Sequence, residues 1–187
     1  MRVIGGYLRG KKVFEPLDKT TRPLKDMVRE SIFNILDHSK NEFVKIQKSK
    51  VLDLFSGTGS FGIECLSRGA EKVFFFENYL NSLKILKKNL KYLNLESKSK
   101  IFEKNSYKIK QIDLVNEKLD LIFLDPPFED NEINLLIKII KKIKIVDNNT
   151  LIILHRNRKK KEKISDEIKI LREKNYGLSK IIFGKIY

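Results

Sequence analysis

The sequence contains very few of the residues from which disulfides and metal sites are built. Its 187 residues include one cysteine, Cys65, and two histidines, His38 and His155. A single cysteine excludes an internal disulfide, and so few ligands speak against a zinc-type metal site. No apolar run approaches the length of a membrane span, and the basic, glycine-interrupted start is unlike a secretory signal. We therefore expect a cytoplasmic protein without a metal.

Acidic residues are fewer than basic ones: the chain has 24 Asp and Glu and 39 Lys and Arg, which gives a formal net charge of +15. This charge fits a polyanionic partner such as nucleic acid. Lysine, isoleucine and asparagine are all abundant, as AT-rich coding DNA would also produce, so the size of the charge has a second explanation. With 41% hydrophobic residues, the chain is long and apolar enough for one well-cored domain.

Strands and helices alternate through most of the chain. Short apolar runs indicate strands, and apolar residues at helical spacing predict helices between them. The expected strands are 51–55, 73–76, 100–103, 119–124 and 151–154, and the expected helices are 61–68, 80–93, 106–115 and 132–145. This pattern predicts an α/β fold with a parallel sheet covered on both faces. Two further strands, 168–173 and 180–187, predict a closing hairpin that adds an antiparallel strand.

The first 40 residues precede this alternation. Two strand-like pieces, 2–4 and 12–14, have glycines between them and predict a hairpin that carries Arg9 and Lys11. A helix is expected over 25–38, after Arg22, and the polar segment 39–49 is expected to be a linker. The basic hairpin is equally consistent with a flap that contacts RNA and with a solvated edge.

A glycine-rich loop, Asp53-Leu54-Phe55-Ser56-Gly57-Thr58-Gly59, follows the first strand of the alternation. Glycines let the backbone approach a ligand, and open parallel sheets bind ligands beyond the carboxyl ends of their strands. Glu77 ends the next strand, where a carboxylate can accept hydrogen bonds from both hydroxyls of a ribose. GTGSFG is close to the dinucleotide pattern, so an NAD-binding domain is a rival. Asp53 favours a cationic sulfonium cofactor with a free amino group, because dinucleotide loops need no carboxylate there.

A second loop, Asp125-Pro126-Pro127-Phe128, follows the apolar run 119–124. Two consecutive prolines fix two backbone angles and remove two N–H donors, so the strand must end there. Asp125 and the Pro126 carbonyl could accept hydrogen bonds from the amino group of a base and turn its lone pair towards a methyl donor. Phe128 could stack on the flipped base. The alternative is an aspartate that only caps the loop.

These segments resemble the RsmD family, bacterial ribosomal RNA methyltransferases that act on a guanine 2-amino group in the small subunit. The resemblance covers nearly the whole chain: the matching segments are MRVIGGYLRGKK, TRPLKDMVRESIFNIL, VLDLFSGTGSFGIECLSRGA and LDLIFLDPPF. It implies a Rossmann-like class I methyltransferase fold with a seven-stranded, mostly parallel sheet, an antiparallel last strand, and an N-terminal β-hairpin and helix. It also implies one domain over 1–187, in which residues 1–40 form an RNA-contacting extension of a catalytic core at 50–187.

The resemblance also implies roles for single residues. Those that would bind S-adenosylmethionine come from the glycine loop and the ends of the next two strands: Asp53, Phe55, Ser56, Gly57, Gly59, Glu77, Asn105 and Ser106. Those that would hold the guanine come from the second loop: Asp125, Pro126 and Phe128. Charge and position, and not the resemblance, make Arg9, Lys11, Arg22 and Arg156 candidates for RNA contacts, and a merely solvated surface is the alternative for each. The implied partner is 16S ribosomal RNA or the small ribosomal subunit, and we expect a monomer.

Two positions depart from the family pattern. Asn78 follows Glu77 where a second acidic residue is common nearby, and His155 stands at the end of the fifth strand where Glu is common. Three rival functions remain open. An adenine 6-amino DNA methyltransferase usually carries a sequence-reading domain, for which this chain has little room. A non-catalytic assembly factor does not need the intact Asp125 and glycines, and an NAD-dependent oxidoreductase leaves the Asp-Pro-Pro-Phe loop unexplained.

Overall fold

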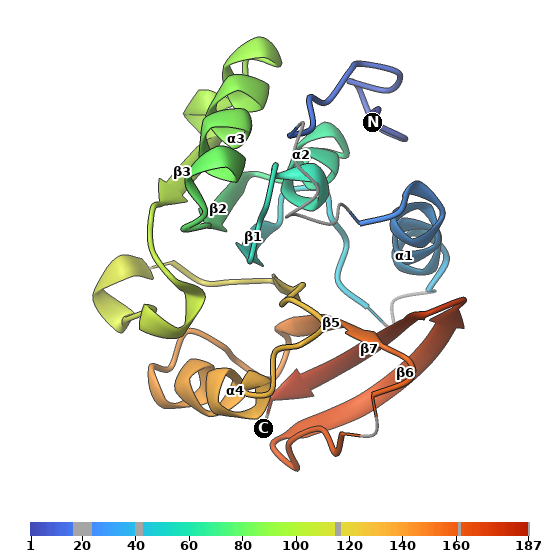
Figure 1. Cartoon of the computed structure of the whole chain (residues 1–187), viewed down its shortest axis with the longest axis vertical. Coiled ribbons are helices and arrows are strands. Elements are labelled where there is room, and N and C mark those ends of the chain that lie inside the picture. The colour runs from blue at the N-terminus through green and yellow to red at the C-terminus, as the bar shows by residue number, and fades with distance from the viewer. Residues whose placement is uncertain (17–23, 40–42, 115–116, 161, 187) are drawn as a thin grey trace.

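The computed structural model describes residues 1–16, 24–39, 43–114, 117–160 and 162–186. A seven-stranded sheet of order β3-β2-β1-β4-β5-β7-β6 lies at its centre (Figure 1). The strands are β1 (Lys50–Leu54), β2 (Lys72–Phe76), β3 (Ser99–Phe102), β4 (Leu121–Leu124), β5 (Leu151–Asn157), β6 (Ile168–Tyr176) and β7 (Ser179–Ile186). The strands from β3 to β5 are parallel, and β7 is antiparallel to both of its neighbours. The predicted mostly parallel sheet with an antiparallel last strand is therefore confirmed.

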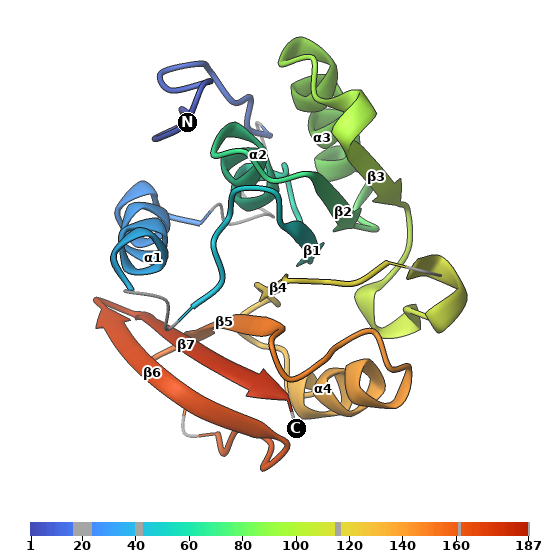
Figure 2. The ribbon, with the colours of Figure 1, turned by 180° about the vertical axis from the view of Figure 1, so that it is seen from behind.

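Helices cover both faces of this sheet (Figures 1 and 2). α1 (Asp26–His38), α2 (Ser60–Ser67) and α3 (Leu80–Tyr92) pack on one face, and α4 (Ile133–Lys142) packs on the other. Successive residues of a strand point to opposite faces. Odd-numbered strand residues such as Phe123 and Ile153 therefore face α1, α2 and α3, whereas even-numbered ones such as Leu124 face α4. This alternation decides which side chains at the strand ends reach the site.

The N-terminal segment keeps only a short part of the expected hairpin. Within residues 1–16 the pairing of Arg2 with Lys12 is an isolated bridge and not a ladder. The reason is that the backbone binds α2 instead: the N–H groups of Ile4 and Gly5 donate to the carboxylate of Glu64, at 2.8 and 2.7 Å. This carboxylate is buried, so it depends on those donors. The two predicted pieces still pair, because the N–H groups of Val3 and Val13 donate to the carbonyl oxygens of Lys11 and Met1, so the segment is a short hairpin docked on α2.

Two further elements differ in detail. Segment 106–115 was expected to be helical, and its described part forms two short 3₁₀ turns, Ser106–Lys108 and Gln111–Leu114. β5 was expected to end at Leu154 and continues to Asn157, because β7 pairs with its last residues. In the part of the chain that the structure describes, no helix is long and apolar enough to cross a membrane.

Candidate active site

A pocket of about 470 Å³ lies where β1 and β4 end. The strand order reverses between these two strands, and open α/β sheets bind ligands at such a switch point. The register pairs Leu54 with Leu124 and Leu124 with Leu154. The next residues, Phe55, Asp125 and His155, therefore lie at the same level; β1 and β4 end there, whereas β5 continues to Asn157. The volume suits a small-molecule ligand.

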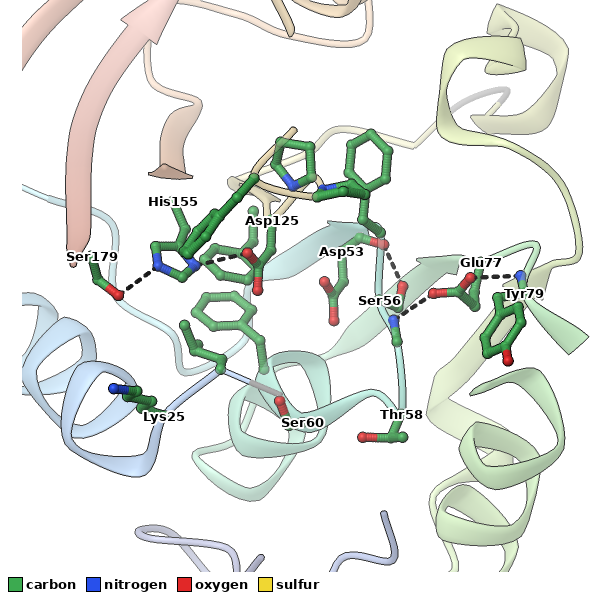
Figure 3. Close-up of a pocket in the computed structure, with 18 of the residues that line it drawn as sticks. Lys25, Asp53, Ser56, Thr58, Ser60, Glu77, Tyr79, Asp125, His155 and Ser179 are labelled. Carbon is green, nitrogen blue, oxygen red and sulfur yellow. Dashed lines mark hydrogen bonds and ion pairs between the residues drawn. The ribbon is translucent and has the colours of Figure 1, made fainter. Parts of the chain in front are cut away.

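The pocket brings together most of the residues that the sequence singles out. The predicted residues that line it are Asp53, Phe55, Ser56, Gly57, Glu77, Asp125, Pro126 and Phe128. It also has lining residues that were assigned no role, among them Lys25, Thr58, Ser60, Tyr79, His155 and Ser179 (Figure 3). The signal for His155 was present in the sequence, because residues 151, 153 and 155 share one face of β5. That face also carries Asp53 and Asp125.

Asp53 is the most deeply buried carboxyl group of the pocket, at 1% exposure. Its Oδ2 atom accepts a hydrogen bond from the backbone N–H of Gly62 at 3.1 Å. Burial raises the pKa of Asp53 well above its usual value, and the nearby carboxylates of Asp125 and Glu77 raise it further, against the effect of that hydrogen bond. A cationic group in the pocket would favour the ionised carboxylate. This end of the pocket is therefore suited to a positively charged ligand.

Glu77 holds the wall beside Asp53. Its Oε2 atom accepts from the N–H of Gly57 at 2.7 Å, and its Oε1 atom accepts from those of Asn78 and Tyr79 at 2.8 and 2.7 Å. Ser56 has a similar structural role, because its hydroxyl donates to the carbonyl oxygen of Asp53 at 2.6 Å. The loop after β1 is thus fixed by side chains that the sequence predicts to contact a cofactor.

Three predicted cofactor residues are not among the described lining residues. Gly59 precedes α2 with φ at +83°, and a Cβ there would lie 2.4 Å from Leu86, so this glycine shapes the turn beneath the pocket. Ser106 accepts a hydrogen bond from the N–H of Phe55 at 3.2 Å. Asn105 accepts one from the N–H of Tyr107 at 2.8 Å. A contact of Asn105 and Ser106 with an adenine stays a prediction.

The second loop carries a chain of hydrogen bonds. The Oδ1 atom of Asp125 lies 2.7 Å from Nδ1 of His155, whose Nε2 atom lies 2.9 Å from the hydroxyl oxygen of Ser179. The ring of Phe128 meets the His155 ring edge-on, with centroids 5.4 Å apart. In Figure 3, His155 lies between Ser179 and Asp125, and Asp53 and Glu77 lie further along the pocket. One end of the pocket therefore has acceptors for an amine beside an aromatic ring.

The structure corrects the expectation that Arg156 grips RNA. The side chain is 1% exposed, and its guanidinium donates to the carbonyl oxygens of Asp130 and Pro127 at 2.5 and 3.4 Å and pairs with Glu162. The reason is that β5 extends past its expected end, which turns Arg156 inwards beneath the loop that follows β4. Arg156 therefore supports the Asp-Pro-Pro-Phe loop from behind.

The other three basic candidates are placed differently. Arg9 and Lys11 are exposed on the N-terminal loop and are not among the described residues that line the pocket. Arg22 lies outside the described residues. Among the described lining residues, Lys25, at the start of α1, is a basic residue that reaches the pocket wall. Contacts of Arg9, Lys11 and Arg22 with RNA stay predictions.

Comparison with known proteins agrees with this geometry. A family model described as Conserved hypothetical protein 95 matches residues 1–185. Ribosomal RNA small subunit methyltransferase D of Haemophilus influenzae is 32% identical over 95% of this chain and 90% of its own length. The structure of the protein yhhF from Escherichia coli has a TM-score of 0.79 at 26% identity and covers 100% of this chain and 97% of its own.

A more distant structure agrees in fold alone. It is an RNA methyltransferase from Salinibacter ruber in complex with S-adenosyl-L-homocysteine, with a TM-score of 0.65 at 14% identity over 88% of this chain and 94% of its own. The structural neighbours share the Rossmann-like class I methyltransferase fold. With the family model matched over almost its whole length, the chain belongs to the RsmD family.

Proposed function

We propose that this protein transfers the methyl group of S-adenosylmethionine to the 2-amino group of a guanine in 16S RNA of the small ribosomal subunit. The relatives named Ribosomal RNA small subunit methyltransferase D support the reaction and the RNA. The observation that carries the proposal is a single pocket with two differently placed carboxyl groups. Asp53 is buried and suits a cation, whereas Asp125 is partly open beside an aromatic ring and suits an amine.

The Asp53 end of the pocket fits S-adenosylmethionine. The Asp53 carboxyl group lacks a cationic partner among the described residues that line the pocket near it, and the amino and sulfonium groups of this cofactor are cations. When bound, the cofactor supplies an electrophilic methyl group. The Glu77 carboxylate has about four lone-pair sites, and three of them accept hydrogen bonds from backbone N–H groups. One site therefore remains for a ribose hydroxyl. These contacts with Asp53 and Glu77 are part of the proposal.

The Asp125 end of the pocket suits guanine better than adenine. An ionised carboxylate is only an acceptor, and guanine presents two donors side by side, its N1–H and its 2-amino group. Adenine presents an acceptor, N1, beside its amino group, which would face the carboxylate unfavourably. Asp125 would orient the amine and accept the proton that the nitrogen releases after methylation. The Pro126 carbonyl would accept from the same amine, and Phe128 would stack on the base.

The proposed RNA contacts lie outside the pocket. Arg9 and Lys11 are exposed on the loop that docks on α2, and Lys25 is at the pocket wall. We assign to residues 1–40 the role of an RNA-contacting extension of a catalytic core at 50–187. A basic chain of this kind binds RNA largely through phosphates, so its affinity should fall steeply as salt rises. We expect it to act as a monomer.

A labelling experiment tests the reaction. Purified protein is incubated with tritiated S-adenosylmethionine and small ribosomal subunits from cells that lack the enzyme, and the labelled nucleoside is identified after digestion. The expected product is 2-methylguanosine, lost in Asp125→Ala and retained in Asp166→Ala, whose carboxylate is 82% exposed. Labelled methyladenosine would overturn the base assignment alone. Cofactor binding without transfer to any RNA or DNA would instead favour the assembly-factor function.

A further inference from the structure

We infer that His155 is a positioning residue for this reaction, which holds the Asp125 carboxylate in the orientation that meets the amine. The inference rests on the proposed function and deepens it. Three side chains from neighbouring parts of the sheet form the arrangement: Asp125 after β4, His155 on β5 and Ser179 on β7. They are joined in that order by hydrogen bonds of 2.7 and 2.9 Å.

The hydrogen bond with Asp125 restricts which ring nitrogen of His155 carries a proton. An ionised carboxylate only accepts, so Nδ1 of His155 must donate to Oδ1 of Asp125. The Nε2 atom lies beside the Ser179 hydroxyl, which can donate to it or accept from it. Asp125 therefore fixes which ring nitrogen carries the proton of their shared hydrogen bond, and Ser179 holds the far side of the ring. In metal sites, the groups that hydrogen-bond a ligating side chain from behind matter nearly as much as the ligand itself, and we apply the same reasoning to the group behind Asp125.

The exposed fractions of the three side chains show which of them can contact a ligand. His155 and Ser179 are 6% and 4% exposed, whereas the Asp125 side chain is 20% exposed. With Oδ1 of Asp125 bound to His155, the contacts of the described residues leave Oδ2 for a ligand. The imidazole also meets the Phe128 ring at an interplanar angle of 77°. His155 thus contacts Asp125 and Phe128, two of the three residues that are proposed to hold the base.

The order Ser, His, Asp is also that of serine hydrolases, in which the serine is the nucleophile. Here the serine is at the closed end, because Ser179 pairs with Asn157 and Tyr176 inside the β5-β7-β6 ladder. The aspartate is at the open end. The geometry therefore assigns the arrangement to holding a carboxylate and not to activating a hydroxyl.

Two substitutions at one position test the role of His155. His155→Leu removes the donor to Asp125, and His155→Asn keeps an N–H group near the place of Nδ1. We expect His155→Leu to lower kcat by about 10- to 100-fold, with the KM for RNA and the Kd for S-adenosylmethionine within about twofold. His155→Asn should recover most of this loss. Ser179→Ala, which removes the hydrogen-bond partner of Nε2, should lower kcat by a smaller factor.

The other possible results distinguish an error in the role of His155 from an error in the proposed function. Transfer by the unchanged protein with equal kcat for His155→Leu overturns the role of His155 and leaves the proposed function standing. The same holds if His155→Asn is as slow as His155→Leu while both have the Tm of the unchanged protein. No methyl transfer by the unchanged protein overturns the proposed function, and the role of His155 falls with it. Thermal unfolding of each variant, with Ser179→Ala as the mildest change, separates lost positioning from lost folding.

Discussion

The Oε2 atom of Glu77 lies 2.7 Å from the backbone nitrogen of Gly57, so a carboxylate at the end of β2 holds the loop that follows β1. Its other oxygen holds the N–H groups just before α3. Three backbone donors thus share one side chain. The wall of the pocket is preorganised by this bracing before a ligand arrives, which lowers the entropy lost on binding.

Glu77→Gln should weaken both the pocket and the fold. The amide replaces one acceptor oxygen by a donor that faces backbone N–H groups, and unpaired groups of this kind cost about 1–3 kcal/mol. We expect a free energy of unfolding lower by that amount and a Kd for S-adenosylmethionine raised at least tenfold. Urea unfolding and calorimetric titration measure the two. Glu71→Gln, at a side chain that is 59% exposed, is the matched control. Weakened binding with unchanged stability would argue against the bracing role.

Asp53→Asn should stabilise the free protein in a pH-dependent way. Burial raises the pKa of Asp53 in the folded protein above its unfolded value of about 3.9. Ionising this group therefore removes stability as the pH rises through the window between the two pKa values. The neutral amide avoids that loss, so the variant should exceed the unchanged protein at pH 8 and match it near pH 4. Urea unfolding at both pH values checks the sign.

The same substitution should impair binding of the proposed cofactor. A cation stabilises the ionised form of Asp53, so the affinity of the unchanged protein for S-adenosylmethionine should rise with pH through the raised pKa. Asp53→Asn should bind it at least tenfold more weakly and with less dependence on pH. Titration calorimetry between pH 5 and pH 8 measures this. Equal affinity of both proteins at pH 8 would rule out a contact between Asp53 and the cofactor's charged groups.

Gly6 and Gly10 offer a matched pair in the N-terminal loop. Both have a positive φ, of +73° and +82°, but a Cβ at Gly6 would lie 1.9 Å from the Ser67 carbonyl oxygen, whereas one at Gly10 would meet nothing within 4 Å. Gly10→Ala should cost about 1 kcal/mol from backbone strain alone. Gly6→Ala should cost more, because the loop must also move away from α2. Urea unfolding compares them, and equal losses would contradict the docking of Gly6.

Arg156→Lys should slow the reaction without changing the contacts between the protein and RNA phosphates. Lysine keeps the charge but cannot reproduce the contacts with Asp130, Pro127 and Glu162, and disturbing such a buried network costs about 3–5 kcal/mol. Stability and kcat should both fall. In Arg156→Gln, which removes the charge, the slope of log K for RNA against log salt should also stay constant, since a lost phosphate contact would change it by about 1. Arg158→Lys, at an exposed neighbour, should leave stability and kcat unchanged.

The parts of the site that the sequence predicted are those where local chemistry dictates the backbone. Glycines after one apolar run and prolines after another mark two strand ends, and a parallel sheet places such ends at one edge. Asp53 and Asp125 therefore meet as expected. Side chains of alternate residues along a strand point to the same face of the sheet. Because Asp53 and Asp125 both fall on the odd-numbered positions, both lie on the side of α2.

The parts that were missed depend on partners far away in the chain. Nothing between residues 151 and 157 shows that β7 will pair there, so neither the buried position of Arg156 nor the link from His155 to Ser179 could be foreseen. The shortness of the N-terminal hairpin has the same cause. Glu64, about 60 residues later, binds the N–H groups of Ile4 and Gly5, which follow the paired residues of the first piece.

The place of β7 in the sheet sets the order in which the enzyme is completed during its own synthesis. β7 lies between β5 and β6 although it is the last strand of the chain, and it supplies Ser179. A nascent chain that has emerged only as far as β5 already has both loops of the pocket, but β5 is still an open edge and His155 lacks its partner. The hydrogen bond between His155 and Ser179 thus forms only after β7 has been made and has joined the sheet.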